Sequence, residues 1–423
     1  MYKIKDIIGR EILDSRGNPT VECDIFLDKH IYGRSSVPSG ASKGKYEALE
    51  LRDGNTNRYH GKGVKISIKK IEEIKNKIIN KVFNNITDFD NYLIELDGTE
   101  NKSKLGANTT LALSLSFAKS VSIFNKIDFY EYLSKDKNFI LPVPMINILN
   151  GGAHADNNID FQEFMISPIG ANSFSQSLEF AHEVFNAFRL NLKQLGLNTN
   201  IGDEGGFAPD IDSSKKAIEL IIKSIEQTGL KSGEDIYISL DIAANEIYID
   251  KKYQLKSENL NLTSSQMSSY LEDLVNSYPI YSIEDGMCED DWDGWQNLSA
   301  TLGKKIQLVG DDVFVTNEKI FTKGIKNNIA NSILIKLNQI GTLSETLRVI
   351  DLAKNNDYSF IISHRSGETE DTSIADLSVA TSSKQIKTGS ITRSERTAKY
   401  NQLLRIENKE KNSKFAGKTI LRY

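Results

Sequence analysis

Residues 281–312 read YSIEDGMCEDDWDGWQNLSATLGKKIQLVGDD, and this stretch contains the pattern that decides the fold. The apolar run YSI ends at Glu284, and the next such run, QLVG, ends at Asp311. The step between the two acids is roughly 25 residues, about the length of one strand and one returning helix. The stretch therefore predicts one unit of a repeated strand–helix arrangement.

The same change from apolar to polar residues recurs before and after this stretch. The runs YISL, SILI, FIIS and QI end at Asp241, Lys336, His364 and Lys387, respectively. Apolar residues at helical spacing lie between runs, for example in residues 343–353. The repetition predicts a parallel (β/α) barrel with polar residues at the carboxyl ends of its strands, where such barrels place their active sites.

The first part of the chain is organised differently, and we expect an α+β domain over residues 1–130 followed by the barrel over residues 131–423. In the first domain we expect a strand at 21–27, helices at 66–82 and 106–122, and a loop at 38–44. The composition of that loop fits either an ordinary turn or a mobile lid.

An insertion is expected within the barrel, where the step from Asp241 to Glu284 is longer than the others. Residues 246–255 predict a small hairpin there. Thr263 and Gln266 then predict a capping box that opens the following helix.

Three of the strand ends carry carboxylates, at Asp241, Glu284 and Asp311. Hard cations such as Mg²⁺ prefer oxygen ligands, commonly a few carboxylates together with water and substrate. Each acid alone is better explained as a helix cap or a surface acid. Three of them on consecutive units of one barrel face favour a metal site.

The other strand ends carry cations. A lysine crowded by cations is biased toward its neutral form, so Lys336 could act as a general base, although a structural salt bridge is an equally good explanation of the local sequence. His364, Arg365 and Ser366 offer a planar fork and a hydroxyl that suit a phosphate, or they could form a polar loop. Lys387 adds another cation, which taken singly could be solvated.

Two earlier segments are rich in glycine and polar residues. GDEGG allows close backbone approach around Glu204, and NGGAHADN contains His154, one of five histidines. Gln162 and Glu163 follow, and a structural or surface role is the simpler explanation of each of these residues alone. Taken together, metal-binding acids, a lysine, an isolated carboxylate and an arginine suit proton abstraction next to a carboxylate.

Composition sets wider limits. The formal net charge of −5 argues against nucleic acid or an acidic membrane as the main partner. Cys23 and Cys288 stand in no metal-binding spacing, so we expect reduced structural thiols. We see neither a signal-peptide pattern nor a membrane-spanning run, so a cytoplasmic location without membrane insertion is expected.

Several segments of the chain, in co-linear order, resemble the enolase family, in its bacterial type. They are DSRGNPT (14–20), PSGAS (38–42), EALELRD (47–53), GDEGG (202–206), SIEDG (282–286), GDD (310–312) and SHRSGETED (363–371). The last segment is the most specific, and the resemblance extends over essentially the whole chain.

The resemblance implies an amino-terminal α+β lid domain and a barrel that opens ββαα before six βα units, with one antiparallel strand. It implies reversible dehydration of 2-phosphoglycerate to phosphoenolpyruvate, in glycolysis and gluconeogenesis, with two Mg²⁺ per active site. Enolase-superfamily sites pair a Lys or His base with Mg²⁺.

The resemblance also implies roles for individual residues. Lys336 takes the C2 proton, and Glu204, supported by Glu163, helps the C3 hydroxyl to leave. The first Mg²⁺ is held by Asp241, Glu284 and Asp311, and the second binds with substrate and is helped by Ser42. The implied substrate contacts are phosphate at Arg365 and Ser366 beside His364, carboxylate at Lys387, Gln162 alongside, and His154 closing over the site.

Two positions depart from the family pattern, Lys43 in place of a common Thr and Asn245 in place of a common Ser. Lys43 leaves lid kinetics open: an ammonium that faces inward would strengthen substrate and product binding alike, and one that faces solvent would do nothing.

Two other readings compete. An enolase-superfamily enzyme acting on a non-phosphorylated acid is disfavoured by the 363–371 segment and by Ser42. A surface-binding protein or a scaffold in an RNA-processing assembly would be free to lose Lys336 or Glu204, and both are present. Such a scaffold role, or binding at the cell surface after non-classical secretion, can accompany an active enzyme. A homodimer and an octamer both remain open.

Overall fold

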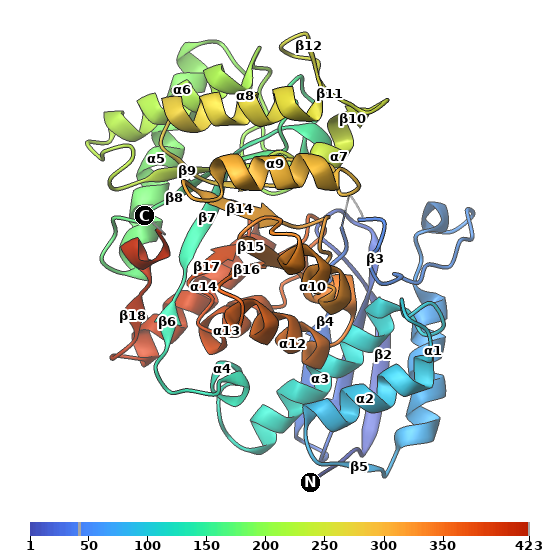
Figure 1. The fold of residues 1–423 in the computed structure, drawn as a ribbon. Coiled ribbons are helices and arrows are strands. Elements are labelled where there is room, and N and C mark those ends of the chain that lie inside the picture. Colours follow the sequence, from blue (N-terminus) through green and yellow to red (C-terminus); the bar gives the residue numbers. More distant parts are fainter. Residues whose placement is uncertain (41–43, 422–423) are drawn as a thin grey trace.

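The computed structural model describes residues 1–40 and 44–421, which form an amino-terminal α+β part and a barrel packed against each other (Figure 1). The predictions for Ser42 and Lys43 lie outside the described residues.

The amino-terminal part is built on an antiparallel sheet in the order β2-β3-β4. Its strands are β2 (Asp6–Leu13), β3 (Pro19–Phe26) and β4 (Tyr32–Ser36). The strand expected at 21–27 is confirmed as β3. Its residues are buried or half-buried along their whole length because β3 is the central strand and α3 (Ala107–Phe124) packs on it.

The helix expected at 66–82 is present but shorter. It is α1 (Lys65–Ile78), and Val82 lies instead in β5 (Val82–Phe83), which pairs with β1 (Tyr2–Lys3). Asn80 has φ 66°, a left-handed conformation, and turns the chain away from the helix. The helix expected at 106–122 is confirmed as α3, and α2 (Ile86–Asp97) precedes it.

The barrel is closed and runs in the order β13-β14-β15-β16-β17-β7-β8-β9. Its strands are β7 (Val143–Asn150), β8 (Glu163–Ser167), β9 (Tyr237–Asp241), β13 (Ile280–Glu284), β14 (Gln307–Gly310), β15 (Ser332–Ile335), β16 (Ser359–Ser363) and β17 (Gln385–Lys387). Nearly all of these strand residues are buried, as expected of a parallel sheet covered by helices. Inside the barrel, Met145, Met165, Val309, Leu334 and Ile361 form one packed cluster.

The expected ββαα opening is confirmed. β8 is antiparallel to both neighbours because residues 151–162, which join it to β7, contain only one short 3-10 turn, Gly152–His154, and no crossover helix. The main helices that follow are α5 (Phe174–Gln194), α6 (Ser214–Gln227), α8 (Ser264–Ser277), α9 (Trp292–Leu302), α10 (Glu318–Lys326), α12 (Leu343–Lys354), α13 (Ser373–Ala380) and α14 (Ser394–Lys409).

The expected insertion between β9 and β13 is present and larger than a hairpin. After the short α7 (Ala244–Ile247), β10 (Tyr248–Ile249) and β11 (Lys252–Leu255) are joined by a third strand, β12 (Leu260–Leu262). The capping box of Thr263 and Gln266 is confirmed at the start of α8.

Shorter elements lie before and after the barrel strands. α4 (Phe129–Leu133) links the two parts of the chain, and β6 (Ile140–Leu141) pairs with β18 (Lys414–Phe415) near the end.

The amino-terminal part contacts the barrel at the start of α12. The backbone N–H of Leu343 donates to Ser114 Oγ at 3.0 Å, and Lys102 pairs with Glu345 at 2.8 Å. α11 (Leu337–Ile340) begins directly after Lys336 and packs against α3, so the amino-terminal part contacts the segment that follows Lys336.

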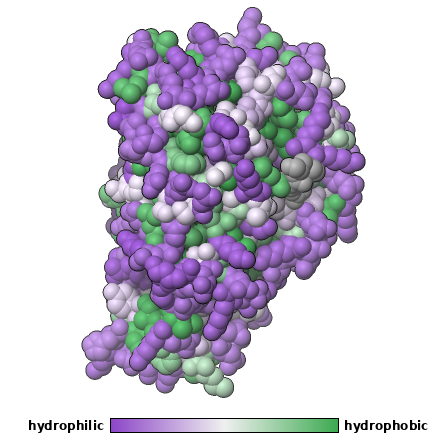
Figure 2. All heavy atoms as spheres, turned by 90° about the vertical axis from the view of Figure 1, so that its left-hand side faces the viewer, coloured by the Kyte–Doolittle hydropathy of each residue, from purple (hydrophilic) through white to green (hydrophobic). Residues whose placement is uncertain are grey.

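On the face of the molecule drawn in Figure 2, hydrophilic residues predominate and apolar residues gather in separate patches. Among the described helices, none is both long enough and apolar enough to cross a membrane.

Candidate active site

The predicted acids converge at one mouth of the barrel. Asp241 is the last residue of β9 and Glu284 the last of β13, and the two stand opposite each other in the strand register. Asp311 directly follows β14. Glu163 begins β8, and because β8 is antiparallel its first residue lies at the same mouth, paired with Asp241. All four carboxylates are buried.

Lys387, at the end of β17, lies among these acids. Its Nζ is 2.9 Å from Asp241 Oδ2, 2.9 Å from Glu284 Oε1 and 3.2 Å from Glu163 Oε1. Burial alone would lower the pKa of Lys387, but the surrounding carboxylates, led by Asp241, raise it well above its ordinary value. Lys387 is therefore a fixed cation.

Lys336 pairs with the third acid, Asp311, through its ammonium and Asp311 Oδ2. Burial lowers the pKa of Lys336 and the Asp311 carboxylate raises it, with a net upward direction. The salt bridge considered from the sequence is therefore present. The salt bridge does not exclude the base role of Lys336. The same Asp311 carboxylate is an expected metal ligand, and a bound cation would neutralise the charge that holds the lysine protonated.

A second cluster surrounds Glu204. His154 Nδ1 lies 3.4 Å from Glu163 Oε1 and 3.6 Å from Glu204 Oε1, and His364 Nε2 lies 3.2 Å from Glu204 Oε2. Burial, followed by the charge of Glu204, raises the pKa of Glu163 to about 7. Burial alone would also raise the pKa of Glu204, but His364 and His154 bring it well below its ordinary value. Of the two carboxylates, Glu163 therefore holds a proton more readily than Glu204 does.

The predicted substrate-binding residues face the same space. Gln162 Nε2 donates to Asp241 Oδ2 at 3.1 Å, and Arg365 Nη1 lies 3.1 Å from Glu47 Oε2. A cavity of about 20 Å³ lies between these groups, which is room for roughly one water molecule. Its lining contains Gly40, His154, Gln162, Glu163, Glu204, Asp241, Lys336, Ser363, His364, Arg365, Ser366 and Lys387. Most of the residues expected from the sequence thus meet around one small cavity.

The acids at the mouth of the barrel are possible ligands for a divalent cation. Among the described residues, close groups of possible ligands are His154 with Glu163 and Glu204, and Asp285 with Asp311 and Asp312. The expected trio forms neither group, since each of its acids faces a lysine. Within the described part, Glu284 Oε2 is buried without a hydrogen-bond partner, and burial followed by Asp241 raises the pKa of Glu284 well above its ordinary value. An unsatisfied carboxylate in this position fits a divalent cation.

The chain matches the family model of the enolase N-terminal domain over residues 4–133, and that of the enolase C-terminal TIM barrel domain over residues 138–423. The chain belongs to the enolase family. Enolase-type catalysis, as a hydro-lyase of the enolase superfamily, follows from this membership.

One departure from the enolase pattern can be examined directly. Asn245 donates to Asp312 Oδ2 at 2.8 Å and accepts from the backbone N–H of Glu289 at 2.8 Å. The amide therefore links the insertion to the end of β14, and it holds Asp312 rather than a predicted ligand.

One residue that holds this enolase site was not predicted from the sequence. Arg396, on α14, lies 2.6 Å from His364 Nδ1, donates to Arg365 O at 2.6 Å and also donates to Ser366 O. It is fully buried and fixes the backbone of the predicted phosphate-binding segment. Nothing in the local sequence SERTAKY distinguishes Arg396 from a surface arginine.

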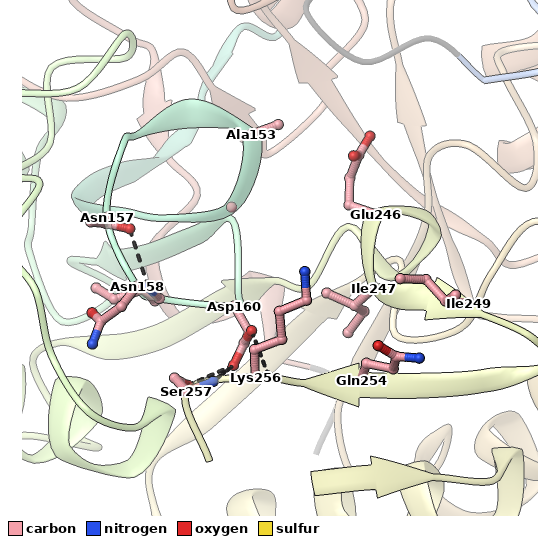
Figure 3. A pocket seen from close by; sticks show the side chains of 12 residues that line it. Ala153, Asn157, Asn158, Asp160, Glu246, Ile247, Ile249, Gln254, Lys256 and Ser257 are labelled. Atoms are coloured by element: carbon pink, nitrogen blue, oxygen red, sulfur yellow. Dashed lines mark hydrogen bonds between the residues drawn. The ribbon is translucent and has the colours of Figure 1, made fainter. Parts of the chain in front are cut away.

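A larger cavity of about 660 Å³ lies beside the site (Figure 3). It separates the loop that contains Ala153 from the strands β10 and β11, and Lys256 and Glu246 line it. Asp160 accepts from the backbone N–H groups of Lys256 and Ser257, each at 2.9 Å. Asp160 therefore anchors the loop that carries His154 to the insertion.

Proposed function

We propose that this enolase catalyses the reversible dehydration of 2-phosphoglycerate to phosphoenolpyruvate, a carbon–oxygen lyase reaction of glycolysis and gluconeogenesis. One observation carries the proposal: a largely buried lysine, with 13% of its side chain exposed, and a buried pair of carboxylates face one cavity from opposite sides. Lys336 follows β15 and Glu163 begins β8, and β16, β17 and β7 separate these strands around the barrel. A base on one side and an acid on the other suit removal of a proton and a hydroxide from adjacent carbons.

Lys336 is the base that takes the C2 proton. Its pairing with Asp311 keeps it protonated, so it must lose this partner's influence before it can accept a proton. Mg²⁺ held by Asp241, Glu284 and Asp311 would neutralise these carboxylates and stabilise the negative charge that develops on the substrate carboxylate. Glu284 Oε2, buried without a hydrogen-bond partner in the described residues, supports this ligand set. A second Mg²⁺ would enter with substrate, helped by Ser42.

Glu204 is the acid that assists departure of the C3 hydroxyl, and Glu163 supports it. The pKa of Glu163, raised to about 7 by burial and then by Glu204, lets the two carboxylates share a proton, and Glu204 would pass this proton to the departing hydroxyl so that it leaves as water. His154 contacts both carboxylates and covers them.

The remaining residues hold the substrate. Arg365 and Ser366, with His364 beside them, bind the phosphate, Lys387 binds the carboxylate, and Gln162 lies alongside. Because the cavity has room for roughly one water molecule, substrate must replace existing partners. For Arg365 the partner replaced is Glu47, at 3.1 Å.

The test is formation of phosphoenolpyruvate, read by its ultraviolet absorbance, from 2-phosphoglycerate with Mg²⁺ present. Glycerate serves as the matched substrate without phosphate. We expect turnover of the phosphorylated acid and none of glycerate. Turnover of glycerate with no reaction of 2-phosphoglycerate would overturn the proposal in favour of another superfamily activity.

A further inference from the structure

The turn after β14 is strained. Val315 has φ 43° and Thr316 has φ 52°, and both side chains are fully buried. Residues branched at Cβ rarely adopt this left-handed region, because it brings the side chain too close to the backbone. The surrounding structure must therefore hold the turn in place, and the contacts of Thr316 indicate what the turn achieves.

The hydroxyl of Thr316 connects two parts of the site. It accepts from the backbone N–H of Lys336 at 3.0 Å and donates to Gln339 Oε1 at 2.7 Å. Because a hydroxyl donates to the amide oxygen, the amide nitrogen of Gln339 must face the other way. That nitrogen donates to Asp311 Oδ1 at 2.9 Å.

These contacts close a ring. It runs from the Lys336 backbone through Thr316, Gln339 and Asp311, and returns to Lys336 through its ammonium, which pairs with Asp311 Oδ2. Thr316 and Gln339 are both buried, so water does not compete for these bonds. The amide occupies Oδ1 of Asp311 and leaves Oδ2 directed at the lysine.

The ring also reaches the amino-terminal part. The backbone N–H of Ala48 donates to Gln339 O at 2.8 Å, and Gln339 Nε2 lies 3.3 Å from Glu47 Oε1. Glu47 is the residue that pairs with Arg365. Gln339 thus contacts both an expected metal ligand and the segment that holds the expected phosphate ligand.

We infer that Thr316 and Gln339 are positioning residues that fix Asp311 and Lys336 relative to each other, so that the Asp311 carboxylate is held in place for the cation while Lys336 stays beside it. This inference rests on the proposed function for the role of Lys336. Its claim about Asp311 stands on the hydrogen bonds alone.

The experiment compares variants that each change one hydrogen-bonding side chain of the ring. Thr316→Val keeps the shape and removes the hydroxyl, Thr316→Ser keeps the hydroxyl, and Gln339→Met removes the amide at similar length. Thr346→Val is the matched control, since Thr346 is equally buried and its hydroxyl donates at 2.8 Å to O of Thr342, the residue that caps α12. Mg²⁺ affinity is measured by calorimetry without substrate, and kcat and KM are measured with 2-phosphoglycerate.

Partners that orient metal ligands are typically worth about 10- to 100-fold in affinity or activity. We expect Thr316→Val and Gln339→Met each to lose Mg²⁺ affinity and kcat within that range, with a smaller change in KM. Thr316→Ser should recover most of the loss, and Thr346→Val should match the wild type.

Wild-type Mg²⁺ affinity and kcat in Thr316→Val or Gln339→Met would overturn the inference. A loss in Thr316→Ser equal to that in Thr316→Val would overturn it too, because removing the methyl group would then matter as much as removing the hydroxyl, and the packing of the side chain rather than its hydrogen bonds would explain the effect. If Thr316→Val does not fold, Gln339→Met decides. Calorimetry needs no turnover, so the two proposals can fail separately. If the wild type did not act on 2-phosphoglycerate but Thr316→Val and Gln339→Met still lost Mg²⁺ affinity, the proposed substrate would be refuted and the positioning of Asp311 would stand.

Discussion

The ammonium of Lys387 lies 2.9 Å from Glu284 Oε1, although the two residues end strands on opposite sides of the barrel. A single lysine therefore spans the mouth and neutralises acids that would otherwise repel one another. The same acids are the expected ligands of a cation, so Lys387 and the cation share the task of balancing charge.

Lys387→Met should destabilise the protein strongly in the absence of a divalent cation and much less in its presence. Removing one partner of a buried ion pair typically costs about 3–5 kcal/mol, because the other charge stays buried and unpaired. Thermal unfolding in chelator and in saturating Mg²⁺ measures the difference. Lys319→Met is the control, since Lys319 pairs with Glu100 on an exposed surface. An equal loss of stability for Lys387→Met in chelator and in Mg²⁺ would show that Lys387 and the cation do not neutralise the same acids.

Mg²⁺ itself should stabilise the wild-type protein. A ligand that binds only the folded state contributes about 2.7 kcal/mol at a hundred times its dissociation constant. A titration followed by thermal unfolding should show this rise, and Asp311→Asn should greatly weaken it. If chelation changes neither activity nor unfolding temperature, the assignment of Asp241, Glu284 and Asp311 as ligands is wrong.

Asp90 should make the protein less stable as pH rises. It is fully buried beside the backbone N–H of Ser344, at 2.8 Å, and burial raises its pKa from 3.8 to about 6. The folded state then holds a proton that the unfolded state has lost, so the favourable contribution is complete below pH 4 and disappears as pH rises through 6. The difference corresponds to about 3 kcal/mol. Asp90→Asn should therefore be more stable than the wild type at pH 7.5 in urea unfolding.

Asp371 provides the opposite case. Burial alone would raise its pKa, but Lys119, 2.8 Å away, lowers it to about 2. Its contribution is present above pH 4 and is lost as pH falls toward 2. Asp371→Asn should thus be less stable than the wild type at pH 7.5. Two variants that shift stability in the same direction at that pH would refute these assignments.

Much of the fold could be predicted because local pattern and topology agree. Each apolar run that ends in a polar residue became a barrel strand, since a buried parallel strand must be apolar until it reaches the mouth. The end of α1 could not be predicted, because Val82 fits the helical spacing and the left-handed Asn80 leaves no strong local signal. The third strand of the insertion, β12, was missed because Leu260–Leu262 is too short to show alternation.

The site was predicted less completely. Residues at strand ends were found, since the barrel brings them to one mouth. Arg396, Thr316 and Gln339 were not, because each acts through contacts that exist only after folding. Arg396 comes from the last long helix, and Thr316 depends on a strained turn that no sequence rule indicates.

The separation of base and acid can be tested by exchange of the C2 proton of 2-phosphoglycerate in deuterated water, followed by NMR alongside product formation. Lys336→Ala should abolish both exchange and product, and Lys336→Arg should restore neither, because a guanidinium does not act as a base at working pH. Glu204→Gln should lose product formation and retain exchange. Loss of exchange in Glu204→Gln to the same extent as in Lys336→Ala would contradict the assignment of Lys336 as the base and Glu204 as the acid.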